Sequence, residues 1–373
     1  MMFNSSRVGG LLSKLVEFPS VSGFELELCD FLSEYLSGLG ISVERQEVYK
    51  TGYNVVTRLG RGGEVMVCGH LDVVPELDMP DAFRPITRNG ILYGRGACDM
   101  KGGVAAMILA LEELVKQNKE PNVTFAFVVD EEMYGRGASE LLTRGARAEV
   151  CIITEPTNLK VCIGNASCFE FNLTAYGQSS HGASRENHNA IHLLTKAYAM
   201  MEERVREEFN VAEHEYPMSP IINLGRIEGG YGAWVTPPKA KSEILIHMHP
   251  SIDYKTALSR MKHIVEEISN ELGAKVEITP THGCDGFIID KDRNNKYAKQ
   301  LIQSHKTVTA TEPEVGLIES ETDGNALYHK GGIPCIIYGP GDIKYAHSSR
   351  EQIKLEDVSK AAEVLLHFLE KLT

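Results

Sequence analysis

Short apolar runs alternate with amphipathic stretches over the first 155 residues, and this alternation constrains the fold more than any other feature of the chain. The runs at 64–69, 122–130 and 150–154 are apolar almost throughout, which predicts buried strands. Strands of this kind are typical of a parallel sheet that is covered on both faces. The helical patterns between or beside them fall at 23–40, 102–117 and 135–145. We therefore expect an α/β fold with a mostly parallel sheet covered by helices.

A different order of elements follows between about 166 and 284. Strands are predicted at 168–177, 220–227, 241–249 and 274–280, and helices at 187–209 and 254–272. This β-α-β-β-α-β order is the ferredoxin-like arrangement. The earlier alternation then resumes and ends in a helical pattern from 354. The sequence therefore predicts a catalytic domain of 1–165 and 285–373, into which an α+β domain of 166–284 is inserted.

Length and charge limit the classes of function. A chain of 373 residues exceeds the ~250 to 300 residues at which one hydrophobic core usually stops growing, which also favours two domains. Every apolar window is shorter than the ~18 residues of a membrane span, and the N-terminus lacks the pattern of a secretory signal. We therefore expect a cytoplasmic protein without a membrane partner. A formal net charge of -13 with scattered basic residues argues against a nucleic-acid partner.

The cysteines do not form a recognisable framework in the sequence. Their spacing is irregular, no C-x-x-C is present, and several lie in apolar runs where a reduced thiol packs as a small hydrophobe. We expect neither a disulfide framework nor a cysteine zinc knuckle. The eight positions are Cys29, Cys68, Cys98, Cys151, Cys162, Cys168, Cys284 and Cys335.

Ionisable side chains stand where the predicted strands of the larger domain end. In an open α/β sheet the functional crevice lies outside the carboxyl ends of the strands. The side chains that follow these strands, or lie in the Gly-rich loop before the helix at 102, are His70, Asp72, Asp99, Asp130, Glu131, Glu132, Glu155, His347 and Glu351. The sequence therefore predicts that two imidazoles and several carboxylates meet at one edge of the sheet.

Each of these signals has an ordinary structural interpretation when taken alone. A single histidine at a strand end is usually a satisfied core residue, the D-E-E at 130–132 is usually a solvated turn, and G-R-G before a helix is usually a tight turn. The segment G-R-G-A-C-D-M-K-G-G also lacks the spacing of a phosphate-binding loop. Only the joint occurrence of these residues indicates a site.

A cation would explain why the acidic groups gather. Buried carboxylates repel one another and lose hydration, so a cluster of them is unfavourable without a positive charge. Imidazole and carboxylate ligands without a thiolate suit Zn²⁺, Co²⁺ or Mn²⁺. A carboxylate shared by two such ions would make a two-metal hydrolytic site.

The sequence resembles the zinc amidohydrolases that include acetylornithine deacetylase, succinyl-diaminopimelate desuccinylase, aminoacylase and glutamate carboxypeptidase. The resemblance covers nearly the whole chain. It rests on H-x-D, G-x-x-D-x-K-G-G, D-E-E, E-P-T and a late G-P-G followed by A-H, which occur here in that order. It implies a zinc-peptidase-like catalytic domain with an inserted lid and dimerisation domain, and hence a homodimer.

The resemblance also assigns roles to residues. It makes Glu131 the general base and implies that Asp72 accepts a hydrogen bond from the ring of His70, which fixes the tautomer of that ring. Asp99 would bridge two zinc ions. The implied metal ligands are His70, Asp99, Glu132, Glu155 and His347.

The inserted domain carries one further expected catalytic residue and several departures from the family pattern. His181 in G-Q-S-S-H-G-A stands where the family supplies a histidine from the partner subunit to the developing oxyanion. His247 replaces the usual arginine that holds a substrate carboxylate. Trp234 and Arg185 replace the usual asparagine and proline.

The sequence thus predicts a metal-dependent hydrolase of the amide bond in small N-acyl amino acids. A metallocarboxypeptidase or dipeptidase acting on short peptides is the alternative within the same chemistry. Two other classes remain as rivals: a binding protein that keeps the fold without catalysis, and a nucleotide-binding α/β protein. The first would lack a ligand or the base, and the second would need the glycine pattern that is missing here.

Overall fold

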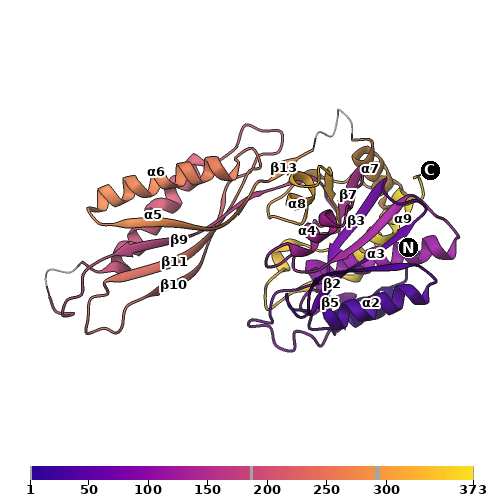
Figure 1. Ribbon diagram of the computed structural model, residues 1–373, viewed down its shortest axis with the longest axis horizontal. Coiled ribbons are helices and arrows are strands. Elements are labelled where there is room, and N and C mark those ends of the chain that lie inside the picture. The colour runs from indigo at the N-terminus through magenta and orange to yellow at the C-terminus, as the bar shows by residue number, and fades with distance from the viewer. Residues whose placement is uncertain (1, 185–187, 290–294, 373) are drawn as a thin grey trace. The chain divides into compact units, whose positions relative to one another are not determined.

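The computed structural model describes residues 2–184, 188–289 and 295–372 and divides the chain into two compact units. The larger unit comprises Met1–Gly164, Ile289–Leu317 and Thr322–Thr373, and the smaller unit comprises Asn165–Ile288 and Ile318–Glu321. The domain boundaries expected from the sequence differ from this division only at 165, 285–288 and 318–321. The elements of both units are labelled in Figure 1.

The larger unit is built on a sheet whose centre is parallel. β3 pairs in parallel with β6 and β7, and β15 pairs in parallel with β7, whereas β1, β2 and β8 add antiparallel pairings on either side. The expected mostly parallel α/β sheet is confirmed. The first seven strands of its spatial order are β1 (Val43–Tyr49), β2 (Gly52–Leu59), β6 (Val123–Val128), β3 (Val65–His70), β7 (Val150–Ile153), β15 (Cys335–Ile337) and β8 (Val161–Asn165). The short β13 (Phe287–Ile288) ends this order, and β14 (Val315–Ile318) pairs with β8.

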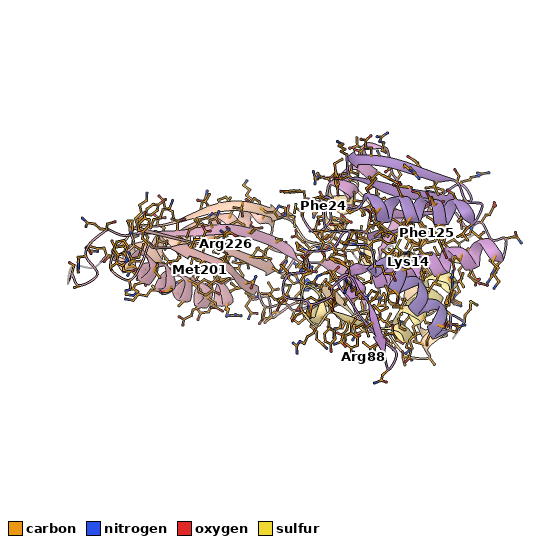
Figure 2. All side chains as sticks on the ribbon, turned by 90° about the horizontal axis from the view of Figure 1, so that it is seen from below. Lys14, Phe24, Arg88, Phe125, Met201 and Arg226 are labelled. Atoms are coloured by element: carbon orange, nitrogen blue, oxygen red, sulfur yellow. The ribbon has the colours of Figure 1, made fainter. Side chains whose placement is uncertain are left out.

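Helices cover this sheet. α3 packs on β3, α1 and α9, and every residue from Gly102 to Leu111 is buried, which explains why this part of the helix is apolar on all sides. Phe125 of β6, labelled in Figure 2, is part of the core of this unit. The helices are α1 (Ser5–Val16), α2 (Leu26–Gly38), α3 (Gly102–Lys116), α4 (Arg136–Thr143), α7 (Lys296–Thr309), α8 (Gly324–His329) and α9 (Leu355–Leu369).

The smaller unit has the expected β-α-β-β-α-β order. Its antiparallel sheet runs β10-β11-β9-β12, and its helices α5 and α6 pack against the sheet around a core that includes Phe171, Met201 and Ile264. A separate sheet domain inserted in the larger unit is therefore confirmed. The elements are β9 (Ser167–Tyr176), α5 (Ala190–Glu208), β10 (Ile221–Gly229), β11 (Lys239–Met248), α6 (Tyr254–Leu272) and β12 (Val276–Cys284).

The remaining elements are short. A three-stranded antiparallel sheet has the order β16-β5-β4. Among the described residues, none of the helices combines the length and the apolar character needed to cross a membrane. The short elements are β4 (Ile86–Arg88), β5 (Ile91–Tyr93), the π-helical turn η1 (Ala97–Lys101), β13 (Phe287–Ile288), the 3₁₀ turn η2 (Ile343–Tyr345) and β16 (Gln352–Lys354).

Candidate metal centre

His70 is the last residue of β3, and its side chain is only 1% exposed. Its Nδ1 lies 2.8 Å from the backbone carbonyl oxygen of Asp72. Because a carbonyl oxygen only accepts hydrogen bonds, Nδ1 donates, and in the neutral ring Nε2 keeps its lone pair. This Nε2 lies 3.1 Å from Asp99 Oδ1 and 3.6 Å from Glu155 Oε1. His70, Asp99 and Glu155 therefore present one group of potential metal ligands.

Asp99 also belongs to a second group. Its other oxygen, Oδ2, lies 3.5 Å from His347 Nε2, and that same nitrogen lies 2.9 Å from Glu132 Oε2. The ligand atoms of Asp99, Glu132 and His347 all lie within 4.8 Å of one another, as do those of the first group. The structure thus brings the five expected ligands together in the larger unit as two triplets that share Asp99. Each oxygen of the shared carboxylate faces a different imidazole.

Glu131 lies beside the first triplet without belonging to either one. Its Oε2 is 4.0 Å from His70 Nε2, and its side chain is 14% exposed. The neighbouring Glu132 contacts His347 instead. The two adjacent carboxylates of the D-E-E turn therefore face different surroundings, and only one of them reaches a triplet.

The side chain of Asp72 has a different role from the one expected. Its carboxylate does not make the short hydrogen bond to the His70 ring, because Asp72 Oδ1 lies 3.7 Å from Nδ1 while the Asp72 backbone carbonyl lies at 2.8 Å. The carboxylate instead accepts hydrogen bonds from the backbone N–H groups of Glu131 and Glu132, each at 3.1 Å, and from the hydroxyl of Ser22. Asp72 therefore orients His70 through its backbone and the two glutamates through its side chain.

Asp130, the first residue of the D-E-E turn, holds the turn through its contact with Arg136. This residue follows β6 with a φ of 69°, and its buried carboxylate accepts two hydrogen bonds from the guanidinium of Arg136, at 2.6 and 2.8 Å. A paired, two-point contact of this kind defines orientation as well as distance. Asp130 and Asp72 together hold the backbone of Glu131 and Glu132.

Gly103 and Gly339 leave room for the backbone of Thr154 and Glu155 to pack against them. A Cβ at Gly103 would lie 2.0 Å from the carbonyl oxygen of Thr154, and a Cβ at Gly339 would lie 2.4 Å from that of Glu155. Any other residue at these positions would push the E-P-T segment away from the centre. The K-G-G and G-P-G motifs thus have a packing role that the sequence analysis did not assign to them.

A buried ion pair that the sequence analysis missed supports Asp99. Arg95 and Glu351 are each only 1% exposed, and Arg95 Nη1 lies 2.6 Å from Glu351 Oε2. The other carboxylate oxygen, Oε1, accepts hydrogen bonds from the backbone N–H groups of Cys98 at 3.0 Å and Asp99 at 3.1 Å. Glu351 therefore connects the C-terminal loop to the backbone of the shared ligand. No sequence signal pairs residues 256 positions apart.

The carboxylates give the two histidines unusual acidities. Burial works to lower the pKa of His347, but the hydrogen bond to Glu132 and the charges of Glu132 and Asp99 outweigh it and raise that pKa to about 9. Burial likewise opposes the charge of His70, yet the charges and hydrogen bonds of Glu155, Asp99 and their neighbours raise its pKa well above the usual range. The surroundings therefore favour positive charge at both imidazoles.

Burial also raises the pKa values of two acidic side chains, Glu131 and Asp323. Burial raises the pKa of Glu131 well above its usual range; the charge of His70 opposes this rise, and that of Glu155 adds to it. Burial also raises the pKa of Asp323 to about 7, and its Oδ1 is buried without a hydrogen-bond partner. The acidic groups thus exceed the positive charge that the histidines supply. Divalent cations bound by imidazole and carboxylate would correct this excess, so the residues fit a pair of such ions.

The smaller unit holds the remaining predicted site residues. His181 is exposed, and its Nδ1 accepts a hydrogen bond from the backbone N–H of Ala183 at 3.1 Å. Burial lowers the pKa of His247, which favours its neutral form. Trp234 is 70% exposed, and Arg185 lies outside the described residues. All of the triplet residues belong to the larger unit.

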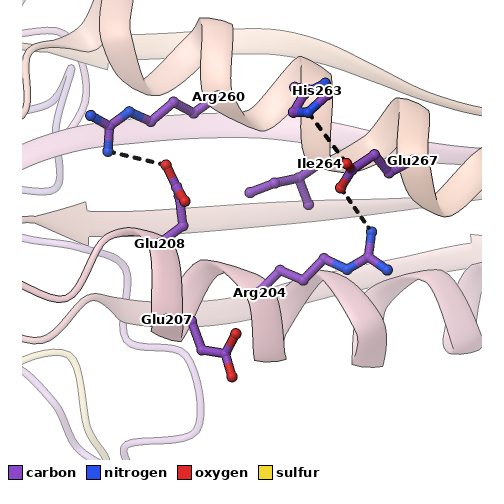
Figure 3. A pocket seen from close by; sticks show the side chains of 7 residues that line it. All are labelled: Arg204, Glu207, Glu208, Arg260, His263, Ile264 and Glu267. Atoms are coloured by element: carbon purple, nitrogen blue, oxygen red, sulfur yellow. Dashed lines mark hydrogen bonds and ion pairs between the residues drawn. The ribbon is translucent and has the colours of Figure 1, made fainter.

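A pocket in the smaller unit, shown in Figure 3, has a structural explanation. It lies between α5 and α6, and both of its arginines form ion pairs with its glutamates: Arg204 with Glu267 at 3.3 Å, and Arg260 with Glu208 at 3.2 Å. Charges paired in this way at a surface need no ligand. We therefore assign the chemistry to the triplets of the larger unit.

Residues 66–371 match the model of peptidase family M20/M25/M40. The chain belongs to this family. The resemblance drawn from the motifs is thus confirmed, and the M20/M25/M40 family is one of hydrolases with metal-binding members.

Individual relatives in the family extend this comparison. The chain is 27% identical over 374 residues to N-formyl-4-amino-5-aminomethyl-2-methylpyrimidine deformylase of Bacillus subtilis, with 91% of this chain and 87% of the relative covered. It is 26% identical over 394 residues to a probable succinyl-diaminopimelate desuccinylase of Staphylococcus aureus, with 95% and 94% covered. The crystal structure of a tripeptidase from Staphylococcus aureus shares the fold, with a TM-score of 0.80, 22% identity, and 100% of this chain and 99% of that chain covered.

The buried ion pair leads to a test of stability. Glu351→Ala is expected to lower the free energy of unfolding by about 3 to 5 kcal/mol, because it leaves the Arg95 guanidinium buried without a partner. Glu314→Ala removes an exposed ion pair with Lys160, in which Glu314 is 65% exposed, and should change stability little. Urea denaturation followed by circular dichroism measures both. Equal transitions for the two variants would show that the buried pair does not support the Asp99 loop.

Proposed function

We propose that the protein is a hydrolase of the amide bond in small N-acyl amino acids or related N-acyl amines, and that it uses two divalent metal ions, preferably Zn²⁺. The observation that carries this proposal is the pair of triplets that share Asp99, with Glu131 next to them and outside both. The ligands would be His70, Asp99, Glu132, Glu155 and His347, with Asp99 between the ions. Such a pair of ions would lower the pKa of a water molecule and polarise the carbonyl group of the amide.

Glu131 would act as general base and then as general acid. It would accept the proton of the attacking water on a carboxylate oxygen and deliver it to the leaving nitrogen. Its burial supports this role, since a low-dielectric environment favours the protonated carboxyl between the two steps. The backbone N–H groups of Glu131 and Glu132 donate hydrogen bonds to the Asp72 carboxylate. These hydrogen bonds support different roles for the two glutamates, with Glu131 as the base and Glu132 as a metal ligand.

The substrate class rests on the relatives and on one departure in the smaller unit. Two relatives are named as a deformylase and a probable desuccinylase, which remove acyl groups from nitrogen. His247 stands at the position of the usual carboxylate-binding arginine, and its burial favours a neutral ring. A neutral ring attracts a carboxylate less than a guanidinium does. This favours N-acyl substrates whose binding depends little on a carboxylate at that position.

Peptide cleavage is the alternative for the same centre. A carboxypeptidase or dipeptidase would use the same ligands and the same base, and would differ in the pocket that recognises the substrate. The non-catalytic binding protein is disfavoured, because the base and all five proposed ligands are present and close together.

A homodimer through the smaller unit is part of the proposal. β10 is a strand at the edge of its sheet, and it exposes Ile221 by 41% and Ile227 by 48%. Unpaired edge strands with exposed apolar residues are ready to associate with another copy. In such a dimer His181 would donate a hydrogen bond to the oxyanion that forms in the partner's centre.

Two variants test whether Glu131 is the base and Glu132 is a metal ligand. Glu131→Gln should abolish hydrolysis of N-formyl, N-acetyl, N-succinyl and dipeptide substrates while the metal content stays near that of the wild type, because Glu131 is not a ligand. Glu132→Gln should lower the metal content. Elemental analysis and activity assays with and without chelator measure both effects. Loss of metal in Glu131→Gln would show that the roles of base and ligand are reversed.

The role of His181 is tested by activity and by mixing subunits. His181→Ala should lower kcat by about 10²- to 10³-fold at unchanged metal content, as expected for loss of an oxyanion donor. His192→Ala, a change at an exposed histidine of α5, is the control and should have no effect.

Mixed dimers of Glu131→Gln and His181→Ala subunits should regain activity, because each hybrid contains one centre with an intact base and an intact histidine from the partner. Hybrids without activity would show that His181 does not act across the dimer.

A further inference from the structure

A second cluster of metal-ligating side chains lies in the smaller unit and shares no residue with the triplets. It consists of Cys168, His282, Cys284 and Glu321, whose ligand atoms all lie within 4.8 Å of one another. The cluster contains two thiols, which the candidate centre lacks. It is therefore chemically different from the centre that the proposed function uses.

Strand pairing brings the first three residues together. Cys168 of β9 lies directly opposite Cys284 of β12 in the antiparallel register. Directly opposite side chains point to the same face of a sheet. His282 stands two residues before Cys284 on the same strand, and its ring is partly exposed. The backbone of the sheet thus places these three side chains without help from a flexible loop.

Glu321 completes the cluster from a distant part of the sequence. One oxygen, Oε2, lies 3.1 Å from Cys284 Sγ and 3.4 Å from His282 Nε2. The Cys168 thiol is buried, whereas His282 and Glu321 are 49% and 38% exposed in their side chains. The four ligand atoms therefore converge around one point that an ion can reach from solvent.

We propose that Cys168, His282, Cys284 and Glu321 bind one Zn²⁺ ion, or another thiolate-preferring divalent ion, as a structural site of the smaller unit. Two thiolates, an imidazole and a carboxylate are all established zinc ligands, and four protein ligands make a closed tetrahedral site. The thiolates select soft or borderline ions, whereas the carboxylates and imidazoles of the triplets also accept Co²⁺ and Mn²⁺. The two kinds of site can therefore be distinguished by their metal preference.

The position of the cluster in the chain gives the ion a structural consequence. Cys168 lies just after the chain enters the smaller unit, Cys284 lies just before it leaves, and Glu321 is the last residue before it finally returns to the larger unit. A bound ion would join these three segments of the smaller unit at one point. Because metal binding stabilises only the folded arrangement of its ligands, removal of the ion should lower the thermal stability of this unit.

A pair of cysteines opposite each other in a sheet could instead form a disulfide, and the structure has both as free thiols. A disulfide would consume both thiolates and exclude the ion. It would also need an oxidant, whereas metal binding needs only the loss of two protons. The two outcomes give different masses and different spectra.

Cobalt spectroscopy of the full chain tests the proposal. Reduced, metal-free protein loaded with Co²⁺ should develop a thiolate-to-cobalt charge-transfer band in the near ultraviolet, which the triplets cannot produce because they contain no thiolate. The band should disappear in Cys284→Ala and stay in two controls: Asp99→Ala, which alters the triplets, and Cys29→Ala, which removes a buried cysteine of α2. No band in the wild type, or a band unchanged in Cys284→Ala, would overturn the proposal.

A zinc titration supplies an independent measurement. Zinc content should fall by about one ion per chain in Cys284→Ala, and the milder Glu321→Gln, which keeps the shape of the side chain, should weaken zinc binding at this site. Activity of the triplet centre is not the readout, so failure of the proposed function would leave the result interpretable. A Cys168–Cys284 disulfide that forms in the presence of zinc, detected by mass spectrometry, would contradict the proposal.

Discussion

The repulsion among buried carboxylates at the carboxyl edge of the central sheet is the constraint on which the larger unit depends. Asp99, Glu131, Glu132 and Glu155 gather there with the imidazoles of His70 and His347. Residues outside this set hold the segments of Asp99, Glu131 and Glu132. Asp72 binds the backbone of the two glutamates, Arg136 binds Asp130, and the Arg95–Glu351 pair binds the backbone of Asp99. These supports keep the ligands in place against a repulsion that cations would relieve.

The two units differ in the donors that they offer to metal ions. The larger unit combines imidazoles with carboxylates around a shared aspartate, which suits hydrolytic chemistry. The cluster in the smaller unit combines two thiols with an imidazole and a carboxylate, which suits a closed structural site. In our proposals, the donor atoms therefore distinguish a catalytic centre in the larger unit from a structural site in the smaller unit. The smaller unit would then depend on metal for stability, and the larger unit for activity.

The sequence predicts local features of this protein well and distant contacts poorly. Continuous apolar runs identified β3, β6 and β7, and helical periodicity placed α3 and α6 within a residue or two of their observed bounds. Strand β1 was missed because it is largely polar and only partly buried, and β2 was missed because polar residues interrupt its apolar run although nearly all of the strand is buried. Asp323 gave no periodic or motif signal, and nothing in the sequence paired Glu351 with Arg95. The Asp72 carboxylate binds backbone groups rather than the expected ring. The cysteine cluster was missed because its four residues come from three separate segments, so no ligand spacing marks it.

The most direct test of the account is the metal stoichiometry of Asp99→Ala, measured by elemental analysis in a Cys284→Ala background so that the cluster of the smaller unit does not contribute. The parent variant should hold about two ions per chain in the triplets, and Asp99→Ala should lose both, because one carboxylate belongs to both triplets. Glu155→Ala, which alters only the first triplet, should weaken one ion more than the other. An Asp99→Ala protein that still holds two ions, or a parent that holds none after addition of Zn²⁺ or Co²⁺, would contradict a shared two-metal centre.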